Sequence, residues 1–90
     1  MFVAVALELS NDDHIFAVDL LLKEYGFSEV IKNHYESVKL KENVLSRLKR
    51  DIDRRTDAFD IVRIYQYPLE DTLVITTLKD KHWKRIVVNK

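Results

Sequence analysis

The sequence contains no cysteine, and it has only one glycine and one proline in 90 residues. Without cysteine the chain cannot form disulfide bonds, thiolate zinc sites or cysteine nucleophiles. A single glycine excludes a glycine-rich phosphate-binding loop. With so few chain breakers, most of the molecule is expected to be regular secondary structure. No apolar run approaches the roughly 20 residues of a membrane-spanning helix, so we expect no membrane association.

The chain also lacks an excess of charge of either sign, because fifteen basic and fifteen acidic residues give a formal net charge of zero. This balance disfavours a generic polyanion-binding protein but leaves local basic patches open. The apolar share of 47% and the charged share of 33% are typical of one small globular domain. No basic segment precedes the first apolar stretch, and Glu8 interrupts it, so we expect no signal peptide and a cytoplasmic location.

The pattern of apolar residues predicts strands and helices in alternation. Strands are expected at residues 2–9, 27–38, 58–67 and 72–78, with a short last strand at 85–88; Pro68 is expected to end its strand, and residues 69–71 to form a turn. Helices are expected from the capping residues at 10–13 to Tyr25 and from Glu42 to Arg54. The predicted class is α+β: a ferredoxin-like strand–helix–strand–strand–helix–strand core in residues 1–69, with residues 70–90 as a C-terminal β extension at a dimer or partner interface.

The strands carry apolar side chains on both faces, whereas two helices cover only one face of an antiparallel sheet. In the first strand, one face holds Val3, Val5 and Leu7, and the other holds Phe2, Ala4, Ala6 and Glu8. A second apolar face would be exposed in a monomer, so we predict a homodimer packed sheet to sheet about a two-fold axis. The alternative is that the C-terminal strands fold back over this face.

Four stretches resemble, in their order and spacing, the second CRISPR-associated protein family, the small subunit of the spacer-integration complex. They are FVAVALELSNDD, LLLKEYGF, EVIKNHYES and FDIVRIYQYPL, and the last is similar to the family's Asp-x-Val-Arg-Ile-Tyr strand. Glu8 replaces the family's aspartate, and Asn33, Tyr35 and Ser37 replace its Ser, Phe and Gly. The resemblance implies a homodimer in antiviral defence that bridges CRISPR integrase subunits and binds duplex DNA or RNA.

Glu8 is the first candidate for chemistry. In the resembled family the aspartate at this position is the proposed metal ligand of a nuclease activity, so Glu8 is predicted as both catalytic residue and metal ligand. Two-fold symmetry would bring two Glu8 carboxylates together, and Mg²⁺ or Mn²⁺ would relieve their repulsion and activate water. His34 is the candidate general acid or base. The alternatives are a Glu8 that faces solvent or pairs with Arg63, and a His34 that is a surface or dimer-contact residue.

Basic residues in two segments are candidates for phosphate contacts that do not read sequence. They are Arg47, Arg50, Arg54 and Arg55 on or just after the second helix, and Lys81, Lys84 and Arg85 around Trp83. A solvated helix face is the commoner explanation of the first group. Trp83 is interpreted either as a stacking platform for nucleic acid or as an anchor against a partner.

The leading hypothesis is a homodimeric, nucleic-acid-binding subunit of the spacer-acquisition machinery. The first alternative is a metal-dependent endonuclease that hydrolyses RNA or DNA through paired Glu8 residues. A toxin ribonuclease of the VapD type and a ferredoxin-like dimer with no nucleic-acid role are the remaining alternatives.

Overall fold

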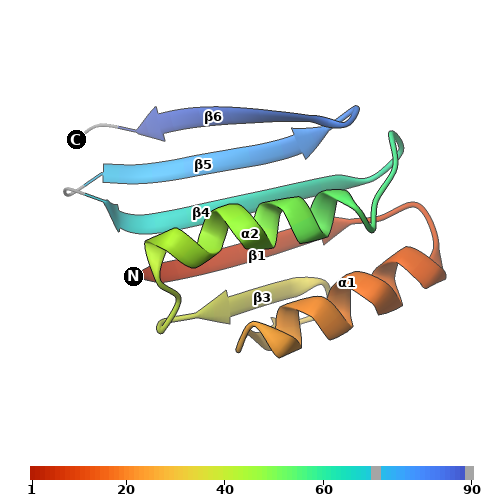
Figure 1. The fold of residues 1–90 in the computed structure, drawn as a ribbon, viewed down its shortest axis with the longest axis horizontal. Coiled ribbons are helices and arrows are strands. Elements are labelled where there is room, and N and C mark those ends of the chain that lie inside the picture. The colour runs from red at the N-terminus through yellow and green to blue at the C-terminus, as the bar shows by residue number, and fades with distance from the viewer. Residues whose placement is uncertain (70–71, 89–90) are drawn as a thin grey trace.

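The structure is a computed structural model that describes residues 1–69 and 72–88. Its elements follow one another along the chain as in Figure 1: β1 (Phe2–Glu8), α1 (Asp12–Glu24), β2 (Ser28–Ile31), β3 (His34–Ser37), α2 (Glu42–Asp53), β4 (Ile61–Leu69), β5 (Thr72–Lys79) and β6 (His82–Val88). Asn11 caps α1, since its side-chain oxygen accepts a hydrogen bond from the backbone N–H of His14 at 2.9 Å. Among the described residues, no helix is long and apolar enough to cross a membrane.

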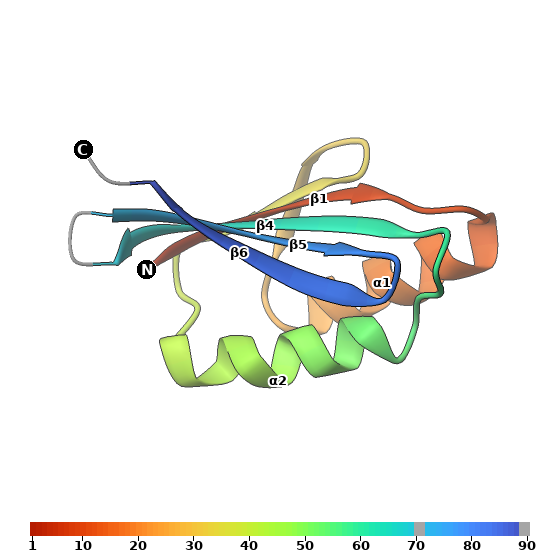
Figure 2. The same ribbon diagram turned by 90° about the horizontal axis from the view of Figure 1, so that it is seen from above.

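The strands form one six-stranded sheet in the order β2-β3-β1-β4-β5-β6, and every neighbouring pair is antiparallel. Both helices lie on the same face of this sheet (Figure 2). The predicted α+β class, with two helices on one face of an antiparallel sheet, is confirmed. The strand order is compatible with a ferredoxin-like core extended by β5 and β6.

Two turns with left-handed backbone account for the wrong strand boundaries. The strand predicted at residues 27–38 is a hairpin, because the chain turns between β2 and β3 at Asn33, whose φ is 65°. Asp80 (φ 52°) and Lys81 (φ 64°) make a second two-residue turn, so β6 begins at His82 instead of Arg85. Positive φ at both central residues is what a tight hairpin needs, and here it is reached without glycine.

The prediction that Pro68 ends its strand is wrong, because β4 runs on to Leu69. The pairing of β4 with β5 becomes irregular between Gln66 and Leu69, and such an irregularity accommodates a residue that lacks a backbone N–H. Residues 70 and 71 of the predicted turn lie outside the described residues.

The hydrophobic core lies between the sheet and the two helices. It contains the predicted inward-facing residues of β1 together with apolar residues from both helices and from the strands: Val3, Val5, Leu7, Val18, Leu21, Leu22, Leu45, Leu48, Ile52, Val62, Ile64 and Leu78. Burial of each such side chain contributes about 1.5–3 kcal/mol relative to exposure, so this layer holds the helices on the sheet.

The other face of the sheet, which we call the open face, is covered by no element of the described chain (Figure 2). The alternative that the C-terminal strands fold back over it is wrong, because β5 and β6 extend the sheet sideways from β4. Several apolar side chains are consequently exposed on the open face: Tyr67 at 43%, Ile86 at 51% and Val88 at 44% of their surface.

Candidate functional site

The cross-strand register arranges the open face into rows. One row is largely apolar and consists of Ala4, Tyr65, Ile75 and Ile86, with Glu36 at its β3 end. The next row is polar and cationic and consists of His34, Ala6, Arg63, Thr77 and Lys84. Glu8, opposite Ile61, and Lys79, opposite His82, come after it at the ends of their strands. We use the name apolar band for the apolar residues of the first row together with two neighbours: Ala4, Tyr65, Ile75, Ile86, Tyr67 and Val88. We use the name charged end for Glu8, His34, Arg63, Lys79 and Lys84.

The structure brings the two catalytic candidates together at the charged end. Glu8 of β1 and His34 of β3 line one surface hollow of about 400 Å³, together with Arg63 of β4 and Lys79 of β5. The guanidinium of Arg63 is oriented by two contacts: its Nε donates to Thr77 Oγ1 at 3.2 Å, and its Cζ lies 5.8 Å from the centre of the Tyr65 ring.

In a single chain, the charged residues that line this hollow favour the binding of an anion. Among the described residues, Glu8 is the only carboxylate that lines it, and Arg63 and Lys79 stand beside it. The predicted pairing of Glu8 with Arg63 is not among the ion pairs of residues 1–69 and 72–88. A Mg²⁺ or Mn²⁺ ion prefers several oxygen ligands, so the residues of one chain do not fit such an ion, and a second copy would have to supply the paired carboxylate.

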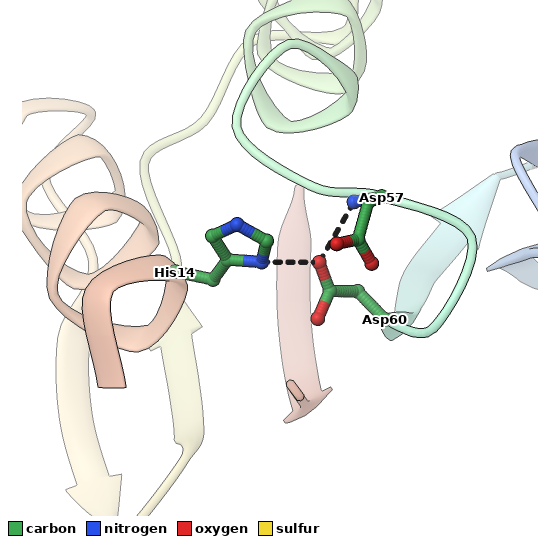
Figure 3. Close-up of side chains that lie close together, drawn as sticks. All are labelled: His14, Asp57 and Asp60. Carbon is green, nitrogen blue, oxygen red and sulfur yellow. Dashed lines mark hydrogen bonds and ion pairs between the residues drawn. The ribbon is translucent and has the colours of Figure 1, made fainter. Parts of the chain in front are cut away.

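In the described part of the chain, one group of three possible metal ligands comes close together, and it lies elsewhere. His14, Asp57 and Asp60 have ligand atoms within 4.8 Å of one another (Figure 3). The fully buried Asp60 accepts four hydrogen bonds. Its Oδ1 accepts from the backbone N–H (2.7 Å) and the hydroxyl (2.8 Å) of Ser10, and its Oδ2 accepts from the Asp57 N–H (2.8 Å) and His14 Nδ1 (2.7 Å).

These four donors give Asp60 a structural role, because they occupy the lone pairs that a metal ion would need. Burial by itself raises the pKa of Asp60, but the hydrogen bonds from Ser10, Asp57 and His14 together outweigh burial and hold its pKa below the ordinary value. The ionised carboxylate therefore ties the β1–α1 connection to the α2–β4 connection. Sequence reasoning missed this residue, since its partners Ser10 and His14 are far away along the chain.

The basic residues predicted to contact nucleic acid do not share one surface. Arg47 lies on α2, Arg54 and Arg55 follow its last residue, and all three contact groups of the protein itself. Arg47 Nε donates to the Tyr25 hydroxyl at 3.2 Å, Arg55 Nη1 donates to the Asp51 carbonyl at 2.8 Å, and Arg54 Nη1 lies 3.9 Å from Asp51 Oδ1. The partners of these arginines are thus a tyrosine hydroxyl, a backbone carbonyl and a carboxylate of the protein itself.

The remaining predicted residues are divided among three places. Lys81 Nζ donates to the carbonyls of Asp53 and Thr56 and thereby caps the C-terminal end of α2. Arg50 is exposed on α2. Lys84 and Arg85 are exposed on β6, where Lys84 belongs to the open face and Arg85, the next residue, points to the other side.

Arg85 lies near Lys49 of α2. Burial first, and the charge of Arg85 second, lower the pKa of Lys49. Lys49 Nζ is 5.9 Å from the centre of the Trp83 ring, and Trp83 packs against the protein's own core. Trp83 therefore has an intramolecular packing role, and the two interpretations made from the sequence stay predictions. We call Lys49 and Arg85 on the helix side of β6, together with Lys84 on the opposite side of the same strand, the basic edge.

Comparisons of the chain with protein-family models, curated proteins and solved structures gave no match.

Proposed function

We propose that the protein is a homodimeric nucleic-acid-binding scaffold, a divergent ferredoxin-like member of the second CRISPR-associated protein family that bridges integrase subunits during spacer acquisition. The observation that carries the proposal is the open face, which combines an exposed apolar band with a charged end on one uncovered sheet. The sequence resemblance and the strand order β2-β3-β1-β4 support the same assignment.

The apolar band supports the homodimer. No element of the described chain covers it (Figure 2), and Tyr67, Ile86 and Val88 expose about half of their surface there. A second copy, related by a two-fold axis and packed sheet to sheet, removes this surface from water for both chains at once. The domain is small, so the added burial also increases its stability.

The basic edge supports contact with nucleic acid. Packing of two sheets face to face leaves their edge strands accessible, and β6 is such an edge. Arg85 lies on the same side of β6 as Trp83, whose ring centre is 5.9 Å from Lys49 Nζ. Neighbouring cations at an exposed edge suit the phosphates of a duplex, which they contact without reading its sequence.

Fluorescence anisotropy with a labelled duplex, measured over a range of salt concentrations, tests the nucleic-acid proposal. Lys84→Glu and Arg85→Glu are each expected to weaken binding and to reduce the slope of log K against log salt by about 0.9 per lost phosphate contact. Arg54→Glu makes the same charge change at the C-terminal end of α2, outside the basic edge, and is expected to leave binding unchanged. Absence of binding at low salt, or equal loss in all three variants, would refute the proposal.

Sedimentation velocity tests the homodimer. Ile86→Glu places a carboxylate in the apolar band and is expected to shift the protein from dimer to monomer. Val38→Glu is the matched control, because Val38 is 69% exposed but lies in the connection after β3, outside the open face. A wild-type protein that remains monomeric at high concentration would contradict the sheet-to-sheet dimer.

A second candidate function is a Mg²⁺- or Mn²⁺-dependent nuclease, and the observation that favours it is the hollow shared by Glu8, His34, Arg63 and Lys79. It depends on the homodimer, because one chain supplies a single carboxylate. Glu8→Gln is expected to abolish metal-dependent cleavage of RNA or DNA and to leave the dimer intact. Glu36→Gln, which changes another exposed carboxylate of the open face, is the control. Cleavage that survives Glu8→Gln would rule out this function for the hollow.

A further inference from the structure

Helix α1 carries apolar side chains on two opposite sides. Val18, Leu21 and Leu22 are buried in the core, whereas Phe16 and Leu20 on the outer side are 65% and 47% exposed. A helix at the surface of a globular protein normally presents polar groups outward, and one that is apolar all round is normally covered on every side. The outer side of α1 therefore has the composition of a contact surface.

The exposed residues of α1 form a regular stripe with opposite charges at its two ends. Asp13, Phe16, Leu20 and Lys23 follow one another at intervals of three, four and three residues, the spacing that aligns side chains along one face of a helix. All four are exposed, and 3.6 residues per turn place them opposite the buried Val18. We call these residues the outer stripe of α1.

We propose that the outer stripe of α1 packs antiparallel against the same stripe of a second copy of this chain. About the two-fold axis of such a contact, Phe16 meets the partner's Leu20 and Asp13 meets the partner's Lys23, and each contact occurs twice. A parallel arrangement would set like charges against each other. The stripe is thus self-complementary in one orientation only.

The charges at the ends of the stripe are available for this contact. Lys23 Nζ lies 3.0 Å from Asp19 Oδ2 of the same helix, and an exposed pair of this kind is weak. The ammonium has three N–H donors, so it can bridge Asp19 and the partner's Asp13. Asp13 stands in the first turn of α1, where its charge also suits the helix dipole.

This second interface is independent of the open face, because α1 lies on the opposite side of the sheet (Figure 2). A contact of one short helix with another is smaller than the interfaces of stable dimers. It is therefore a weak, reversible contact that becomes populated as the concentration rises. Together with the sheet-to-sheet dimer it would link dimers into larger assemblies.

The test is a charge-reversal experiment in the Ile86→Glu background, which removes the apolar-band contact and separates this proposal from the proposed function. Sedimentation velocity over a range of concentrations is expected to show reversible dimerisation of Ile86→Glu alone. Adding Asp13→Lys or Lys23→Glu is expected to weaken it by about ten-fold or more, because each creates like-charge contacts in both halves of the interface. Arg54→Glu, at the C-terminal end of α2, is expected to leave the association unchanged.

Mixing the Asp13→Lys and Lys23→Glu variants gives the decisive measurement. In a mixed pair, the two substituted side chains face each other with opposite charges, and so do the native Lys23 of one chain and the native Asp13 of the other. Association is therefore expected to return, and loss of folding cannot produce such a rescue. Phe16→Glu is expected to abolish association in every combination. Absence of dimerisation in the Ile86→Glu background, or a mixture that associates no better than the separate variants, would overturn the proposal.

A disulfide experiment provides a second readout, since the chain has no native cysteine. Asp13→Cys and Lys23→Cys, each made singly and mixed in equal amounts under mild oxidation, are expected to cross-link mainly with each other. A statistical mixture of like and unlike pairs would contradict the antiparallel register.

Discussion

The substitution Asp60→Asn removes the charge of the buried carboxylate while keeping the shape of its side chain. One oxygen becomes an NH₂ group, which faces either the two donors of Ser10 or the donors of Asp57 and His14. In either orientation a backbone N–H that now donates to the carboxylate at 2.7 or 2.8 Å loses its acceptor. Hydrogen bonds to charged groups contribute about 1.5–3 kcal/mol each. We therefore expect a loss of about 2–4 kcal/mol from a total stability of roughly 5–15 kcal/mol.

Urea unfolding at pH 7 measures this loss, with Asp57→Asn as the matched control. Asp57 Oδ1 accepts a hydrogen bond from the Phe59 N–H at 2.9 Å, which an asparagine oxygen also accepts. The control should stay within about 0.5 kcal/mol of wild type. A loss in Asp60→Asn as small as that of the control would show that the four hydrogen bonds do not stabilise the two connections.

Acid provides an independent check on the same residue. The pKa of Asp60 is lower in the folded state than its ordinary value, so its contribution to stability is complete above about pH 3.9, the value for an unperturbed aspartate. The contribution is lost as the pH falls through the folded-state pKa. The stability difference between wild type and Asp60→Asn should therefore shrink below about pH 4, and a difference that widens in acid would refute the assignment.

Three further predictions concern single contacts. Tyr35→Phe removes a buried hydroxyl that donates to Asp19 at 2.6 Å and should lower the free energy of unfolding in urea by about 1–2 kcal/mol; an unchanged stability would show that this bond is not needed. Gly26→Ala adds a Cβ to a residue whose φ is 89°, and no heavy atom lies within 4 Å of that Cβ. The only expected cost is backbone strain of about 1–2 kcal/mol, which would lower the melting temperature. An unchanged melting temperature would contradict the left-handed conformation of Gly26. Lys81→Met removes the cap at the Asp53 carbonyl and should accelerate amide hydrogen exchange in the last turn of α2, whereas exchange as slow as in wild type would argue against the cap.

The sequence predicted the elements whose signals are local. Alternation in β1 correctly separated the buried Val3, Val5 and Leu7 from the other side of the strand. The polar residues before α1 and the glycine after it correctly marked that helix, and Asn11 is the capping residue. The excess of apolar residues over what two helices can cover correctly indicated a sheet with an exposed apolar face. These features succeeded because side-chain periodicity depends only on neighbours along the chain.

The hairpin between β2 and β3 was missed because its turn contains no glycine. Asn33 adopts a positive φ of 65°. Asparagine tolerates this conformation, but an asparagine in the sequence does not by itself indicate a turn. Arg47 and Arg50 were correctly placed on a helix, yet a sequence does not reveal that Tyr25, at the end of another helix, contacts Arg47. For the same reason the sequence does not reveal that Trp83 packs against the protein's own core.

By itself, the sequence determined the α+β class, the approximate extent of both helices and the presence of apolar residues on both faces of the sheet. These features depend on the spacing of apolar residues and on capping residues, which are local properties of the chain. Only the tertiary structure decided that Glu8 and His34 share a hollow with Arg63 and Lys79, and that Asp60 joins two connections. These groups meet because folding brings strands and loops that are far apart in sequence side by side. Such contacts depend on the free energy of packing the whole chain, which no local stretch of sequence contains.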